Sequence, residues 1–194
     1  MGLMIYSLDS IPLSASRDYF IYLLDYGWDE PISNIIMRNY DEMAKISAEH
    51  EAVVIKGTVA AHFNNEVLSW HNFNGQSTDD LLPAILITNK HPVSFRESNV
   101  EHSYKNKGIY TFWDDELKMI LIPLRYVCAS ETDVINIIRS IFKDIKSGKK
   151  LENFSVAKDL KKGVGKALVD SVILQPNFNG IGFDIGNFMK SLKR

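Results

Sequence analysis

The chain has 194 residues, of which 45% are apolar and 24% charged, with a formal net charge of −2. These values are typical of one globular domain, which at this length buries roughly 70% of the surface of its unfolded chain. Its one cysteine, Cys128, excludes an intramolecular disulfide and a cysteine-based zinc site, and it favours a reducing compartment. No run reaches the roughly 18 apolar residues of a membrane span, and no basic residue precedes the N-terminal apolar run as in a signal peptide. We therefore expect a cytoplasmic protein that makes no membrane contact.

Hydrophobic periodicity predicts the elements of the first half of the chain. A short apolar run predicts a strand at residues 3–8, and a face of aromatic and leucine side chains predicts a helix between residues 14 and 27. A second helix follows at 32–46, with its apolar residues at the 3.6-residue period. A buried strand at 52–55 and a short helix at 64–70 complete this half.

The middle of the chain contains the longest strand and the best helix. Residues 82–88 are predicted to form an apolar strand, and we expect an antiparallel hairpin to join 109–113 to the longest candidate strand, 117–127. A helix then begins near Ser130 and stops at Gly148.

Three weaker elements are expected near the C-terminus. They are a helical segment at 154–160, a final strand at 168–174 and a closing helix at 184–192.

The alternation of these elements predicts an α/β fold with a mixed, mainly buried central sheet and helices on both faces. The strands around 53–55, 85–87 and 120–122 are apolar on both faces, as strands covered on both sides are. A thioredoxin-like order (strand, helix, strand, helix, antiparallel strand pair, helix) resembles residues 3–146 in topology only, because the paired cysteines of that family are absent. We expect one domain over 1–194, with 149–194 either part of it or a basic C-terminal extension packed on it.

Charge is unevenly distributed along the chain. Residues 139–194 hold 12 Lys and Arg against 5 Asp and Glu, so the rest of the chain is acidic. This favours an anionic partner, such as nucleic acid or another polyanion, at the basic end, although a solvated helix face and charges that meet in the fold are the alternatives. The tryptophans near turns suggest a protein interface instead. The candidate binding residues are Lys143, Lys146, Lys149, Lys150, Lys161, Lys162, Trp28 and Trp113.

A nuclease-like arrangement supplies the candidate catalytic residues. Glu116 and Lys118 open a strand and point to one face, where a carboxylate and a lysine can hold Mg²⁺ and activate water. This resembles the restriction-endonuclease-like nucleases, but their aspartate on a preceding strand has no good counterpart here. His91 and Arg96 follow a buried strand end, where α/β proteins often place functional groups. The histidines lack metal-ligand spacing, and we expect neither a metal nor a cofactor.

The leading hypothesis is therefore a non-catalytic binding or regulatory subunit of a larger intracellular, bacterial assembly, with another protein chain as its partner. The bacterial origin rests on an Ile-, Asn- and Lys-rich composition that suits an AT-rich genome. One alternative is a metal-dependent phosphodiesterase or nuclease that uses His91, Arg96, Glu116 and Lys118. The other is a nucleic-acid-binding module that uses the basic C-terminal region.

Overall fold

The computed structural model describes residues 1–26, 31–71, 73, 81–97, 117–158 and 173–174. These residues form one mixed sheet of six strands in the order β1-β3-β2-β4-β5-β6. Strands β1, β3 and β2 are parallel to one another, whereas β4, β5 and β6 each run antiparallel to the neighbour before them. The strands are β1 (Gly2–Ile5), β2 (Tyr19–Leu24), β3 (Ala52–Gly57), β4 (Ala84–Thr88), β5 (Met119–Pro123) and β6 (Ile173–Leu174).

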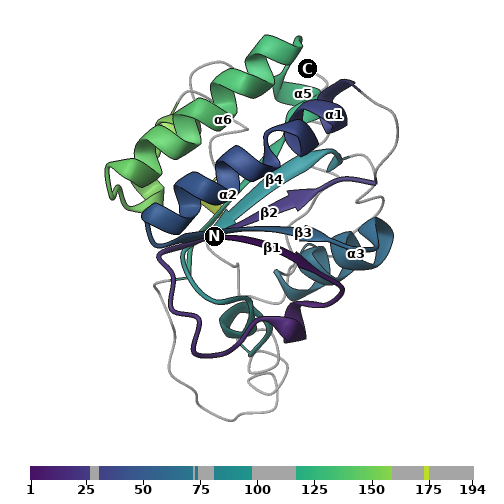
Figure 1. Ribbon diagram of the computed structural model, residues 1–194, viewed down its shortest axis with the longest axis vertical. Coiled ribbons are helices and arrows are strands. Elements are labelled where there is room, and N and C mark those ends of the chain that lie inside the picture. Colours follow the sequence, from purple (N-terminus) through teal and green to yellow (C-terminus); the bar gives the residue numbers. More distant parts are fainter. Residues whose placement is uncertain (27–30, 72, 74–80, 98–116, 159–172, 175–194) are drawn as a thin grey trace.

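Helices cover both faces of this sheet (Figure 1). The Lys56 ammonium of β3 lies 4.0 Å from the ring centre of Tyr40 in α2. A Cβ on the next residue, Gly57, would come within 2.3 Å of the Phe63 Cβ in α3. Because successive strand residues point to opposite faces, α2 and α3 lie on opposite sides of β3. The helices include α1 (Pro31–Arg38), α2 (Tyr40–Glu49), α3 (Ala60–Trp70), α5 (Leu124–Val127) and α6 (Glu131–Lys146), with 3₁₀ turns η1 (Leu8–Ser10) and η3 (Leu151–Asn153).

The predicted α/β fold class is thus confirmed, and so is the burial of its central strands. Every residue of β2, β4 and β5 is buried, as are the first four residues of β3. The core of the molecule therefore lies along both faces of the central strands.

The thioredoxin-like order is present from β2 to α6. Strand β2 is followed by α1 and α2, strand β3, helix α3, the antiparallel pair β4–β5 and then α6. The order begins at β2, and the strand predicted at residues 3–8 is instead β1, Gly2–Ile5, at the edge of the sheet.

The helix predicted between residues 14 and 27 is wrong, because Tyr19–Leu24 form strand β2. Aromatic and leucine side chains three and four residues apart also fit a short apolar run, and six residues are too few for periodicity to separate the two. Burial on both faces at the centre of the sheet favours the strand.

Two other predicted elements have different bounds. The helix expected at 32–46 is divided into α1 and α2 at Asn39. The strand expected at 117–127 ends at Pro123, after which Leu124–Val127 form the single turn α5. Because proline has no N–H to donate, the strand ladder cannot continue through it on that side.

Other predictions lie wholly or partly outside the described residues. These are the strand at 109–113 with its hairpin and the closing helix at 184–192. Residues 155–158 are helical as expected, and within 168–174 only β6 is described.

Helix α6 begins and ends where the sequence predicts. The Ser130 hydroxyl accepts the Asp133 N–H at 3.3 Å, and the Asp133 carboxylate accepts the Ser130 N–H at 2.9 Å, so the two form a capping box. After the helix, Gly148 takes a φ of 59°, a left-handed conformation that glycine adopts without steric cost.

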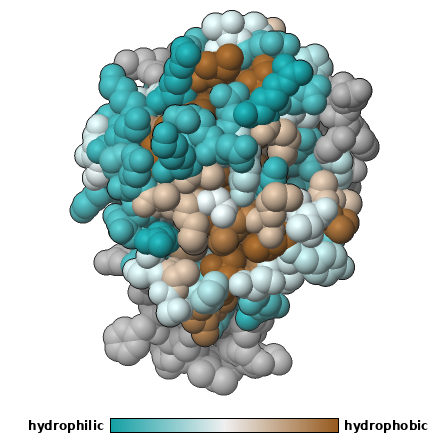
Figure 2. Space-filling model, viewed as in Figure 1, coloured by the Kyte–Doolittle hydropathy of each residue, from teal (hydrophilic) through white to brown (hydrophobic). Residues whose placement is uncertain are grey.

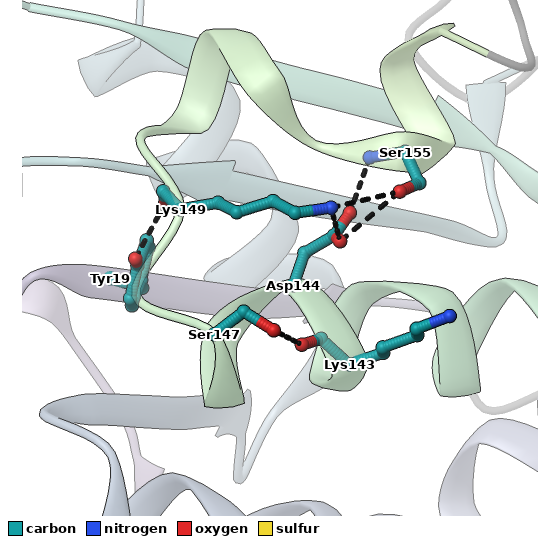
Figure 3. A network of polar contacts seen from close by, with 6 residues as sticks. All are labelled: Tyr19, Lys143, Asp144, Ser147, Lys149 and Ser155. Atoms are coloured by element: carbon teal, nitrogen blue, oxygen red, sulfur yellow. Dashed lines mark hydrogen bonds and ion pairs between the residues drawn. The ribbon is translucent and has the colours of Figure 1, made fainter.

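The buried carboxylate of Asp144 holds the segment that follows α6 in place (Figure 3). Asp144 is fully buried; it forms an ion pair with Lys149 and accepts the Ser155 N–H. Burial alone would raise the pKa of Asp144, but the hydrogen bonds from Lys149 and Ser155 hold it below its usual value. The Tyr19 hydroxyl donates to the Lys149 carbonyl at 2.7 Å, which links this turn to the start of β2.

Candidate functional site

The candidate catalytic residues that the structure describes lie on opposite faces of the sheet. The ring of His91 meets that of Phe20 edge-on, with centroids 5.5 Å apart. The preceding residue, Tyr19, packs against Phe154 on the other face, also at 5.5 Å. Lys118 lies on that other face, because it pairs with Glu152 in the η3 turn beside Phe154. His91 and Lys118 are therefore not brought together, and Glu116 lies outside the described residues.

Lys118 is held by two contacts. Its ammonium is 2.5 Å from the Glu152 carboxylate, and its backbone N–H donates to the Asn89 Oδ1 at 2.7 Å. The hydrogen bond from Lys118 is the main cause of a lowered pKa at Glu152. Lys118 and Glu152 both line a surface depression.

His91 and Arg96 are each held in a local contact. The Val93 N–H donates to the His91 Nδ1 at 3.3 Å, and burial lowers the His91 pKa against the opposing effect of nearby backbone carbonyls. The Arg96 guanidinium is 2.9 Å from the Asp9 carboxylate and lies 4.2 Å over the Trp70 ring. These contacts are typical of residues that hold a loop in place.

The predicted lysine cluster is divided among several environments. Lys143 and Lys146 are exposed on α6, whereas Lys149 is paired with the buried Asp144. Lys150 is exposed and borders the same depression as Lys118. Lys161, Lys162, Trp28 and Trp113 lie outside the described residues.

The cysteine is not activated. Cys128 is half-buried, and burial together with the Asp133 carboxylate raises its pKa to about 11. The thiol is therefore protonated at neutral pH. Within the part of the chain that the structure describes, no three His, Cys, Asp or Glu side chains are grouped as metal ligands.

Sequence reasoning missed a buried polar cluster at the end of β2. The Ser33 hydroxyl donates to the Asp25 Oδ1 at 2.8 Å, and the Asn64 amide donates to the Asp25 carbonyl at 2.9 Å. All three residues are buried, so the cluster ties α1 and α3 to the sheet. Asp25 falls inside the helix predicted between residues 14 and 27, and only its true place after strand β2 makes the cluster recognisable.

Sequence reasoning also missed an exposed apolar patch at the end of β1. Only four large apolar side chains are exposed among the described residues, and three of them belong to this patch. Met4 is 59% exposed, Tyr6 57% and Val59 49%. Tyr6 stacks on the exposed His62 ring of α3, with centroids 4.3 Å apart and planes 17° apart. Figure 2 shows apolar surface in the middle of the view, where Figure 1 places β1.

Strand β1 forms one edge of the sheet, and its backbone groups alternate between β3 and the outside. The Met1 carbonyl accepts the Val54 N–H at 2.8 Å, and the Ile5 carbonyl accepts the Thr58 N–H at 2.9 Å. Odd-numbered residues of β1 therefore bond to β3, and the N–H and C=O groups of Gly2 and Met4 point away from it. The signal in the sequence is an uncharged run over residues 1–8, which contains no proline.

None of the helices that the structure describes is long and apolar enough to cross a membrane. Comparisons with protein-family models, with curated proteins and with solved structures find no match for this chain.

Proposed function

We propose that this domain is a non-catalytic binding subunit of a larger intracellular assembly, and that it holds its partner protein by adding an extended segment of that partner to the edge of β1. The observation that carries the proposal is the coincidence of outward backbone groups with the exposed patch of Met4, Tyr6 and Val59. In strand addition, main-chain hydrogen bonds supply affinity and side-chain contacts supply specificity.

The edge lacks the features by which sheet proteins prevent such pairing. Edge strands are usually protected by lysine, by proline or by inward-pointing charges. Residues 1–8 contain none of these, and the first charged side chain is Asp9.

The patch lies on both sides of the edge. Met4 pairs in register with Lys56, whose side chain turns toward α2, so Met4 points to the α2 face. Tyr6, just past the strand, stacks on α3 on the opposite face. An added strand would therefore find apolar contacts with alternate side chains on both of its faces.

The nuclease alternative gains no support, since His91 and Lys118 lie on opposite faces of the sheet. A partner protein at β1 accounts for the exposed apolar side chains, which a catalytic role for these two residues does not.

The test uses two variants of the full chain at the edge. Met4→Pro removes only the N–H that points away from β3, and Met4→Lys places a charge in the patch. We expect both to weaken retention of a partner, captured from an extract of the source cells, by at least about tenfold, because Met4→Pro removes a main-chain hydrogen bond to the added strand and Met4→Lys places a charge among its apolar contacts.

Ala48→Lys is the matched control, because Ala48 is exposed on α2 near the opposite end of β3 and should leave capture unchanged. Urea unfolding of each variant separates lost binding from lost folding. A partner that both Met4 variants retain at full strength overturns the proposal.

A further inference from the structure

A second surface, at the end of the central strands where β2 begins, has the size of a small-molecule site. A depression of about 540 Å³ opens where β2 begins, β4 ends and β5 begins, and the turn after α6 closes one side of it. This volume lies in the range of about 300–1,000 Å³ that is usual for small-molecule sites. Strand β1 contributes no residue to it, so the site is independent of the proposed function.

The floor of the depression is apolar and fixed. It is formed by the buried side chains of Tyr19 and Leu151. The Tyr19 ring packs on Phe154, and its hydroxyl donates to the Lys149 carbonyl (Figure 3). Because both contacts hold the ring, the floor is already formed before a ligand enters.

The rim carries charges of both signs. Lys90 follows β4, Lys118 precedes β5 and Lys150 precedes η3, and Asp18 and Glu152 line the same depression. The sum of these five charges is positive. Lys150 lowers the pKa of Glu152 in addition to the larger effect of Lys118, which shows that both lysines act on the same part of the rim.

We propose that this depression binds a small phosphorylated molecule that also carries hydroxyl groups, such as a sugar phosphate. Lysine ammonium groups bind phosphate as point charges, and Lys118 and Lys150 supply this positive end. Carboxylates accept hydrogen bonds from hydroxyls, and Asp18 and Glu152 supply that end.

The two carboxylates also make a long polyanion an unfavourable ligand for this depression. A nucleic acid strand would bring several phosphates across the depression, and some of them would lie against Asp18 or Glu152. A single phosphate can bind at the lysines and leave the acidic side to neutral hydroxyls. The ligand phosphate competes with Glu152 for Lys118, so binding rearranges the ion pair now present there.

The experiment is calorimetric titration of the full chain with ribose 5-phosphate, inorganic phosphate and ribose at constant ionic strength. We expect ribose 5-phosphate to bind at least about tenfold more tightly than either part alone. Lys118→Ala and Lys150→Ala should each weaken it by about tenfold, the usual effect of losing a charged hydrogen bond. Asp18→Asn should weaken binding of ribose 5-phosphate and leave that of inorganic phosphate unchanged or stronger.

Lys45→Ala, on the exposed side of α2, is the control for loss of a lysine and should bind as the unaltered chain does. Equal affinity for ribose 5-phosphate and inorganic phosphate would show a general anion site and overturn the proposal. So would affinity that neither Lys118→Ala nor Lys150→Ala reduces, or the absence of heat from any of the three probes at millimolar concentration.

Discussion

Protonation of His71 should destabilise the fold in mild acid. His71 follows α3 and is fully buried, with its ring centre 5.2 Å from that of Tyr22 and 4.7 Å from that of Phe95. Its Nδ1 lies 2.7 Å from the Val67 carbonyl, while no described residue hydrogen-bonds to its buried Nε2. Burial among these groups lowers the His71 pKa from 6.5 to about 4.

The sign and size of the effect follow from this shift. Above pH 6.5 the ring is neutral in both the folded and the unfolded chain, so its contribution to stability is complete. Between pH 6.5 and 4 the unfolded chain binds a proton that the folded chain does not. The free energy of unfolding therefore decreases as the pH is lowered through this range. A difference of about 2.5 pKa units corresponds to about 3 kcal/mol, lost in full below pH 4.

The assay is urea unfolding, followed by circular dichroism, at steps from pH 7 to pH 4 for the unaltered chain and for His71→Asn. Asparagine keeps a donor for the Val67 carbonyl and does not titrate. Since all other acids and histidines are shared, the difference between the two curves isolates His71. We expect the advantage of the unaltered chain to shrink by about 3 kcal/mol over this range. A difference that stays constant with pH would refute the reasoning.

Two further substitutions test how the elements are joined, and urea unfolding at pH 7 measures both. Asp144→Asn should cost about 2 kcal/mol, because the charged hydrogen bonds to Lys149 and Ser155 become weaker ones; an unchanged midpoint would contradict this. Gly57→Ala should cost about 1–3 kcal/mol, because the new Cβ would meet the Phe63 Cβ and force β3 and α3 apart; a stabilised variant would show that this contact relaxes freely.

The fold class was predictable because its main signals are local. Helix α6 has a serine cap, an apolar stripe and a glycine stop within one stretch of sequence, and the three signals agree. Strand β2 was not predictable in this way. Its identity as a strand depends on β3 and β4 on either side of it, and these contacts are distant in the chain.

The candidate sites depend still more on distant contacts. The depression joins Asp18, Lys90, Lys118 and Lys150, which no spacing rule connects. Pairing of β2, β4 and β5 brings the first three together, and the contact of Tyr19 with the turn after α6 adds Lys150. The same dependence applies to the catalytic set proposed from sequence, of which Glu116 lies outside the described residues. His91 follows β4 and Lys118 precedes β5 at the same end of these paired strands, but contacts with distant residues hold them on opposite faces: His91 lies against Phe20, and Lys118 pairs with Glu152.

Strand β4, which pairs with β2, is synthesised much later than β2, and this delay has a consequence for folding on the ribosome. The segment Tyr19–Leu24 is uncharged, rich in aromatic and leucine residues, and of the length that forms intermolecular β-structure. Its antiparallel neighbour begins only at Ala84, so a nascent chain waits roughly 3–12 s between completing one and starting the other. During that interval one side of the segment has no native strand to pair with, which makes chains interrupted before β4 the ones most prone to aggregate.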